Sequence, residues 1–417
     1  MSISQNFPNT RPSLNLNFAR SKTLDPRITF SRTSTGTYVD ESGVIRNAVA
    51  DEPRFDHDPV TGECLGLLVE ESRSNLITYS EQFDNAAWGT SPVYTVGIDS
   101  TTAPDGTTSA EKLIRDTTNT QAQIYRNITG ISTNTTYTLS CFCKSAEWSK
   151  IGLREGVATG YWETFDLSVG EKIDNGSGTT STITPYPNEW YRISMTLTTT
   201  ETQTSYGVRI IPLPDSYTSG TPYVNQSGND VDGLYLWGAQ LEEGAFPTSY
   251  IPRPDASTAT REPDNASMVG DNFSDWYNPS EGTIYCSYKN NTTDFTKRRN
   301  VYAIQGTSSG IEIRSPNIDF NRLRFVFNGN FNSNPTEFSA TLNQRKTGFS
   351  YDQTQHNGCI DGTLVTHAEG HSNDNTKNIL YIGNREQNSE DYLNGTISQF
   401  TYYPTRLTNA QLQTLTK

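Results

Sequence analysis

Outward-facing tryptophan and arginine side chains are the residues of this chain best suited to bind a ligand. The stretch "YWETFDLSV" alternates as a β-strand with Phe165 and Leu167 inward, so that Trp162 points away from the core. In "EWYRISMTL" the same alternation turns Trp190 and Arg192 outward. Two other strand patterns add outward arginines at Arg154 and Arg209.

Such a combination of side chains is typical of sugar recognition. A tryptophan ring stacks on the apolar C–H face of a sugar, and an arginine donates hydrogen bonds to its hydroxyl or acidic groups. The pattern therefore predicts a glycan-binding face. The alternative is that another domain or a neighbouring subunit covers these residues. The predicted glycan-binding residues are Trp162, Trp190, Arg154, Arg192 and Arg209.

Three motifs have the spacing of catalytic or metal sites without the surroundings that such sites need. "GTSSG" around Ser308 spells a nucleophile elbow, but no helical pattern follows it. His367 and His371 have the H-x-x-x-H spacing in a segment rich in Gly, Asn and Asp, which favours a loop. Glu242 and Glu243 end a strand pattern, and we expect them to be solvated. The sequence therefore predicts no enzymatic activity.

A glycan-degrading enzyme stays open as an alternative from a different class, because two catalytic carboxylates meet only in space. Cys141 and Cys143 share the apolar face of "TYTLSCFCK", so we expect buried core cysteines rather than metal ligands. The five cysteines of the chain are scattered, and we expect them to be reduced.

The composition limits the class of fold and the partners. A formal net charge of −14 disfavours nucleic acid, whose phosphates need a basic surface. The 22 Tyr, 17 Phe and 6 Trp argue against disorder, and the abundance of Ser, Thr, Asn and Gly favours strands and turns. No apolar run is long enough for a membrane span, and the start has no secretory apolar region. We therefore expect a chain folded in a cytosol, without membrane insertion.

The short alternating strand patterns predict an all-β protein. In it, a β-rich N-terminal arm precedes two antiparallel β-sandwich (jelly-roll) domains. The first sandwich is predicted over 75–251, and the second over 267–417, where Thr408 caps a short final helix. Between them, Pro247, Pro252 and Pro254 and the Ser/Thr/Ala tract of "FPTSYIPRPDASTATREPD" predict a flexible linker over 252–266.

The first 74 residues lack a pattern that would bury a core of their own. "VDESGVI" predicts a β-hairpin that turns at Asp40 to Gly43, and the first 15 or so residues have no periodic pattern. The segment 1–74 is therefore predicted to be an arm that orders against a partner.

Several long motifs make the chain resemble virion proteins of tailed bacteriophages, in the fibre, spike and adhesin group. These are "ITFSRTSTGTYVDESGVIRNAVADEPRFDHDPVTGECLGLLVEESRSNLITYSEQF" and the exit "GAQLEEGAFPTSYIPRPDASTATREPD". "APDGTTSAEKL", "YTLSCFCKSAE" and "NEWYRISMTL" are similar to carbohydrate-binding jelly rolls of the 4/9 type. The C-terminal "KTGFSYDQTQHNGCIDGTLV" and "YLNGTISQFTYY" are similar to laminin-G or concanavalin-A-like sandwiches.

The resemblance implies a tail-fibre or spike adhesin that displays glycan-binding domains for attachment to the host surface. It further implies a location on the virion after assembly in the bacterial cytoplasm, docking to other virion proteins through the arm, and a homotrimer. A capsid-attached fibre or decoration protein is the alternative within this class. No cofactor is implied beyond a structural calcium ion, for which Asp230 and Asp232 of "GNDVDG" could supply oxygens.

Overall fold

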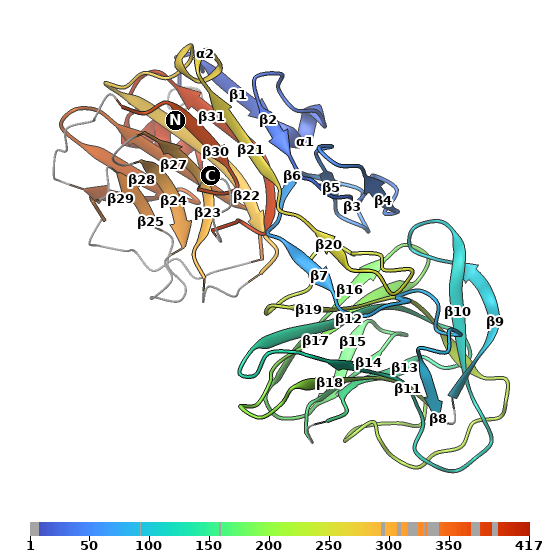
Figure 1. The fold of residues 1–417 in the computed structure, drawn as a ribbon. Helices are drawn as coiled ribbons and strands as arrows, with labels where there is room; N and C mark the ends of the chain where they lie inside the picture. The colour runs from blue at the N-terminus through green and yellow to red at the C-terminus, as the bar shows by residue number, and fades with distance from the viewer. Residues whose placement is uncertain are drawn as a thin grey trace.

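The fold is all-β, as predicted, and consists of two antiparallel sandwiches that form two lobes in Figure 1. The structure is a computed structural model. It describes residues 8–91, 93–157, 160–292, 297–306, 310–315, 324–327, 330–331, 342–367, 376–385 and 391–417.

The first sandwich packs two six-stranded sheets against each other, and the chain crosses between them several times, as in a jelly roll. One sheet has the order β16-β17-β12-β19-β10-β9, formed by Thr179–Tyr186, Trp190–Thr198, Thr136–Ser145, Gly233–Glu243, Thr108–Arg115 and Val93–Thr102. The other has the order β15-β14-β13-β18-β11-β8, formed by Glu171–Asn175, Trp162–Asp166, Lys150–Glu155, Ser205–Leu213, Gln123–Thr129 and Gly89–Ser91.

Strand alternation explains how this sandwich fills its core. Cys141 and Cys143 of β12, Ile193 of β17 and Phe165 of β14 are all fully buried between the two sheets. Burial raises the pKa of Cys141 to about 12, so the thiol is neutral. The prediction of core cysteines is confirmed.

The second sandwich also has two sheets. Its first sheet has the order β29-β28-β27-β22-β31-β6-β5, with Thr363–His367, His356–Ile360, Arg345–Tyr351, Gly282–Asn290, Gly395–Tyr403, Cys64–Val69 and Phe55–His57. Its second has the order β2-β21-β30-β23-β24-β25-β26, with Thr29–Ser31, Asn265–Val269, Ile379–Ile382, Arg299–Gln305, Ile311–Ser315, Arg324–Phe327 and Asn330–Phe331.

Within the described ranges, three short helices complete the fold, at α1 (Phe18–Ser21), α2 (Asp271–Ser274) and α3 (Asn409–Leu415). Thr408 caps α3 as predicted, with its side chain accepting the N–H of Gln411. No helix in the described part of the chain is long and apolar enough to cross a membrane.

The N-terminal segment is part of the second sandwich, which corrects the predicted separate arm over 1–74. β1 (Leu14–Asn17) and β6 pair with the same edge of β31, and β2 pairs with β21. Leu16, Phe18 and Leu67 are buried in the same core cluster as residues of the C-terminal strands. The segment has no core of its own because it completes the core of the second sandwich, whose other strands lie more than 200 residues further along the chain.

A predicted hairpin of this segment is confirmed. β3 (Gly36–Val39) and β4 (Ile45–Ala48) pair around a turn in which the Asp40 N–H donates to the Val44 carbonyl over 2.9 Å. Ile45 of this hairpin packs on the first sandwich. The N-terminal segment therefore contacts both lobes.

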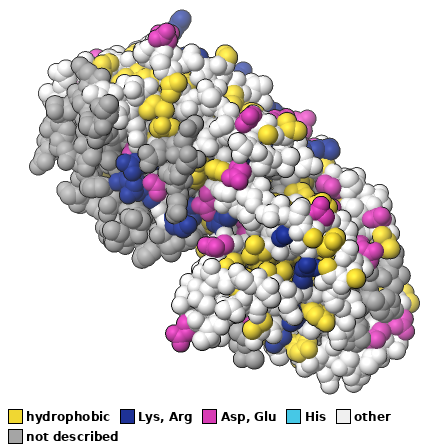
Figure 2. Space-filling view, in the orientation of Figure 1, with side chains coloured by type: hydrophobic (Ala, Val, Ile, Leu, Met, Phe, Trp, Pro, Cys, Tyr) yellow, Lys and Arg dark blue, Asp and Glu magenta, His cyan; other side chains and the backbone are white. Residues whose placement is uncertain are grey.

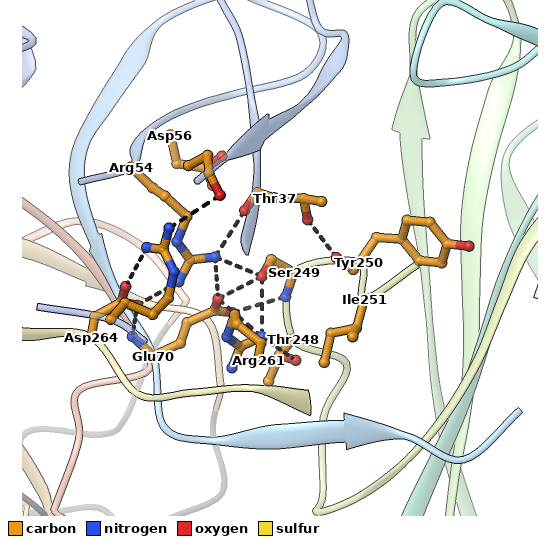
Figure 3. A network of polar contacts seen from close by, with 12 residues as sticks. Thr37, Arg54, Asp56, Glu70, Thr248, Ser249, Tyr250, Ile251, Arg261 and Asp264 are labelled. Carbon is orange, nitrogen blue, oxygen red and sulfur yellow. Dashed lines mark hydrogen bonds and ion pairs between the residues drawn. The ribbon is translucent and has the colours of Figure 1, made fainter. Parts of the chain in front are cut away.

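A two-stranded ribbon and a buried network of charges join the two lobes. β7 (Arg73–Asn75) enters the first sandwich, and β20 (Ala259–Arg261) returns beside it. In Figure 2 the surface narrows at this junction, with Lys, Arg, Asp and Glu side chains beside it. Figure 3 shows Arg54 between the carboxylates of Glu70 and Asp264, with Arg261 next to Glu70.

The side chains of this network are almost completely shielded from solvent. Arg32 donates to Asp264 over 2.9 Å, and both side chains are 0 % exposed. Glu70 also accepts from the backbone N–H and the hydroxyl of Ser249, at 2.8 and 2.7 Å. Burial alone would raise the pKa of Glu70, but Arg261, Arg54 and Ser249 overcome it and lower the pKa to about 2.

These contacts correct the prediction of a flexible linker over 252–266. Residues 254–258 are exposed, but Arg261 and Asp264 are 1 % and 0 % exposed and belong to the network. The partners of these two charges lie about 200 residues earlier in the chain. The local Ser/Thr/Pro composition does not show such distant partners, and it therefore predicted flexibility.

Candidate glycan-binding face

Four residues form one cross-strand row on the outer face of the sheet β15-β14-β13-β18-β11-β8. Tyr125 of β11 stands opposite Arg209 of β18, Arg209 opposite Arg154 of β13, and Arg154 opposite Trp162 of β14. The row faces away from the core, because chain neighbours of its members are core residues: Ile124, Leu153, Val208 and Ile210. Three of the five predicted glycan-binding residues, Trp162, Arg154 and Arg209, thus lie together.

Three glycines beneath the row allow three of its members to lie close to the sheet. A Cβ at Gly89 would meet the Tyr125 ring at 2.3 Å, and a Cβ at Gly156 would meet the Arg209 guanidinium at 2.4 Å. A Cβ at Gly176 would approach Nε1 of Trp162 to 2.8 Å. Glycine at these positions leaves the ring and guanidinium planes room next to the backbone.

Aromatic rings hold both arginines of the row. The Cζ of Arg209 lies 5.0 Å from the ring centre of Tyr125, and the Cζ of Arg154 lies 4.7 Å from that of Tyr223. A guanidinium over an aromatic face at this distance is a cation–π contact, which orients the side chain without using its hydrogen-bond donors.

Most polar atoms of the row remain available to a ligand. Among the residues that the structure describes, none accepts a hydrogen bond from Arg154, from the Trp162 indole or from the Tyr125 hydroxyl, and none of these atoms is sealed from solvent. Toward the described part of the chain, Arg209 uses only Nη1, which donates to the carbonyls of Val208 and Arg126 at 2.9 and 3.4 Å. All four side chains are half-buried.

A loop covers the other end of the same face and sets the limit of the row. Pro222 lies over Gly152 of β13, where a Cβ would meet it at 2.6 Å. Tyr217 packs with Ile211 and Leu213 of β18 in a small apolar cluster that Tyr223 joins from the same loop. The open part of the face is therefore the part that carries the row.

Trp190 and Arg192 are not part of this face, which corrects the prediction for both. They lie on β17 of the opposite sheet, and Trp190 is only 2 % exposed, with its Nε1 donating to the Thr102 carbonyl over 3.1 Å. Arg192 lies over the Phe142 ring and donates to the Thr248 carbonyl over 2.7 Å. Alternation correctly turned both residues away from the core, but other segments cover this second face.

The covering residues come from distant parts of the chain. The cluster around Trp190 contains Ile45, Ala103, Ala110, Phe142, Trp237 and Tyr250. Ile45 belongs to the β3–β4 hairpin and Tyr250 to the exit from the sandwich. The alternative reading of the sequence, in which another part of the protein covers these residues, thus holds for Trp190.

Asp230 and Asp232 lie in a surface turn before β19. Asp230 is exposed, and the Asn229 side chain accepts the N–H groups of Val231 and Asp232. Calcium takes six to eight oxygen ligands, about three times what two carboxylates in single-oxygen contact provide. In the described ranges no group of three or more His, Cys, Asp or Glu could hold a metal ion. The two carboxylates therefore do not form a calcium site by themselves, and the calcium assignment stays a prediction.

The other sequence motifs have different outcomes. Ser308 and His371 lie outside the described residues, and His367 ends β29. Glu242 is not solvated as expected but fully buried, where it accepts from the Gln240 amide and from the backbone and hydroxyl of Thr248. Glu243 is exposed, as expected.

The aromatic partners of the row were missed by the sequence reasoning. Tyr125 had a readable signal, because Ile124 is a core residue and its neighbour in a strand must point outward. Tyr223 had none, because it lies on a loop whose position depends on Pro222 and Gly152.

Comparison with models of known protein families and with curated proteins finds no match. Among solved structures, the chain is similar to the binding domain of botulinum neurotoxin serotype D, with 13 % identity over 36 % of this chain and 39 % of that one, at a TM-score of 0.29. It also matches domain 4 of an extracellular arabinanase from Geobacillus stearothermophilus in complex with arabinotriose, with 12 % identity over 42 % and 84 % of the two chains, at 0.29.

A third match is the Trypanosoma rangeli sialidase in complex with a difluoro sugar acid, with 10 % identity over 73 % of this chain and 60 % of that one, at 0.29. The chain spans about two fifths of the length of the neurotoxin binding domains that it matches. At these TM-scores the similarities are too weak to assign a ligand or an activity.

Proposed function

We propose that the protein is a non-enzymatic adhesin that binds glycans on the outer face of its first sandwich. The observation that carries the proposal is the row of Tyr125, Arg209, Arg154 and Trp162. Its Trp162 indole can stack on a sugar ring, Tyr125 orients Arg209, and the outward donors can bind sugar hydroxyl or acidic groups. Neighbouring strands lie about 4.8 Å apart, so the row is long enough to contact several sugar units.

The composition of the row favours binding over hydrolysis. Glycoside hydrolysis needs two carboxyl groups, an acid and a nucleophile or base, on either side of the scissile bond. The row contains two aromatic rings and two guanidinium groups but no carboxyl group. Its chemistry can hold a sugar chain, but it supplies no group that would cleave it.

The finer proposal places this adhesin on the particle of a tailed bacteriophage, as a tail fibre or spike assembled in the host cytoplasm. The phage-like motifs of the sequence support it, and the homotrimer and the docking to other virion proteins are part of the same proposal. Because the N-terminal segment completes the second sandwich, the docking surface would belong to that lobe. A capsid-attached fibre would present the same binding face.

The proposal is tested by incubating the purified full-length protein with polysaccharides extracted from the surface of the host bacterium. We expect retention on the immobilised polysaccharide without new reducing ends in solution. Failure to bind any of the extracts, or release of reducing ends, would contradict it. Antibody labelling of the purified particles tests the location, which we expect on the tail rather than on the capsid.

A further inference from the structure

The two arginines at the centre of the row are direct cross-strand neighbours, although they carry the same charge. Arg154 stands opposite Arg209 in the register of β13 and β18. Side chains in such positions lie about 5 Å apart at Cβ, and like charges there destabilise a sheet. Burial lowers the pKa of Arg209, and the charge of Arg154 lowers it further against the opposing effect of Glu155. Because this pairing of like charges destabilises the sheet, its presence points to a role in binding.

Charge compensation at this pair differs from that of the three arginines buried at the junction between the lobes. At the junction, Arg32 and Arg54 each pair with Asp264, and Arg261 pairs with Glu70. Within the described ranges neither Arg154 nor Arg209 forms an ion pair. In a chain with 46 acidic and 32 basic residues, two adjacent arginines that form no ion pair with any described residue concentrate positive charge at one place on the surface.

Glu155, the carboxylate that acts on Arg209, does not cancel both charges. It is fully buried, and its oxygens accept the N–H groups of Gly207 at 2.6 Å and Val157 at 3.0 Å. One buried carboxylate next to two guanidinium groups leaves this part of the face with a net positive charge.

We propose that the row selects acidic glycans, with a sugar carboxylate bound between Arg154 and Arg209 and a sugar ring stacked on Trp162. This inference rests on the glycan-binding function proposed above. The guanidinium fork matches the two oxygens of a carboxylate, and such charge-assisted bonds are about twice as strong as those to a neutral hydroxyl. Because the whole chain is acidic, the arginine pair would supply the local attraction that overcomes long-range repulsion.

The test compares acidic polymers with their neutral counterparts. Polygalacturonate, hyaluronate and polysialate are each measured beside the same polymer after reduction of its carboxylates to primary alcohols, at fixed ionic strength. We expect the full-length protein to bind at least one acidic polymer, with affinity falling roughly ten-fold or more on reduction, the order of a lost charge-assisted bond.

Three variants distinguish the contacts. Arg154→Gln and Arg209→Gln should each remove most of the preference for the acidic form while leaving weak binding of the reduced form. Arg11→Gln changes the net charge equally at an exposed position of the other lobe and should leave the preference intact.

The outcomes separate the two proposals. Equal or tighter binding of the reduced polymers, or an equal effect of Arg11→Gln and Arg154→Gln, would overturn acid selectivity while glycan binding stands. Binding of none of these polymers, acidic or reduced, would overturn acid selectivity, whereas failure to bind any host polysaccharide extract would overturn glycan binding itself. Loss of the acidic preference in the two row variants alone would support the inference.

Discussion

Trp162 and Trp190 lie on the outer faces of opposite sheets of the first sandwich, and their surroundings differ. Trp162 of β14 is half-buried next to Arg154, with its indole Nε1 unused by any residue described in the structure. Trp190 of β17 is 2 % exposed, donates to the Thr102 carbonyl and belongs to a buried cluster with Trp237 and Tyr250. Under the proposed function, Trp162 therefore serves binding, whereas the burial of Trp190 gives it a role in stability.

Replacing Trp190 by Ala should destabilise the protein by about 3–5 kcal/mol, the usual cost of deleting a buried tryptophan. Trp162→Ala serves as the matched control and should cost about 1 kcal/mol, as for a partly exposed side chain. Urea unfolding followed by far-UV circular dichroism measures both. Equal losses in the two variants would contradict the assignment of roles.

Gly156→Ala should weaken glycan binding without removing any residue of the row. The added Cβ would lie 2.4 Å from the Arg209 guanidinium, which must move away from its position over Tyr125. Because the displaced atoms are the end of a flexible side chain, stability should change by about 1 kcal/mol or less. Binding to the host polysaccharide is compared with that of Val157→Ala at the next, exposed position. Unchanged binding of Gly156→Ala would show that the position of Arg209 is unimportant.

Asp264→Ala should loosen the junction between the lobes. It leaves Arg32 and Arg54 buried without this carboxylate, and breaking a buried ion pair costs about 3–5 kcal/mol. Limited proteolysis should then cut within 259–264, which the native protein protects, whereas Asp255→Asn in the exposed part of the same segment should behave as the native protein does. A native cleavage pattern in Asp264→Ala would mean that the network does not hold the junction.

Stability should fall in acid partly through Glu70. Its pKa is lowered from the usual 4.5 to about 2 in the folded state, so the unfolded chain binds this proton first as the pH falls. The contribution of Glu70 is therefore complete above about pH 4.5 and is lost progressively towards pH 2. Glu70→Gln should be less stable than the native protein at pH 7, with the difference shrinking below pH 4.5. A difference that does not change over this range would contradict the assignment.

Strand alternation correctly predicted which side chains point into the core and which point outward, as long as the prediction concerned a single sheet. It placed Phe165, Cys141 and Ile193 in the core and turned Trp162 and Arg154 outward, because the two faces of a strand alternate strictly. The outer position of Arg209 followed in the same way, and the all-β sandwich fold was predictable from the same patterns.

Contacts between distant segments could not be predicted in this way. Alternation states which side of a sheet Trp190 occupies, but not that Ile45 and Tyr250 cover that side. Likewise, Arg54 and Asp264 are 210 positions apart, and each alone reads as an exposed charge. The sequence therefore predicted a flexible linker where the structure has a buried network.

The central claim is that the row on the first sandwich binds glycan, and the affinity of Trp162→Ala for host polysaccharide tests it most directly. Loss of one stacking contact should weaken binding by at least about 1 kcal/mol, several-fold in the dissociation constant. The unfolding curve should show that the variant is folded. Binding equal to that of the native protein, in a folded Trp162→Ala variant, would contradict the claim.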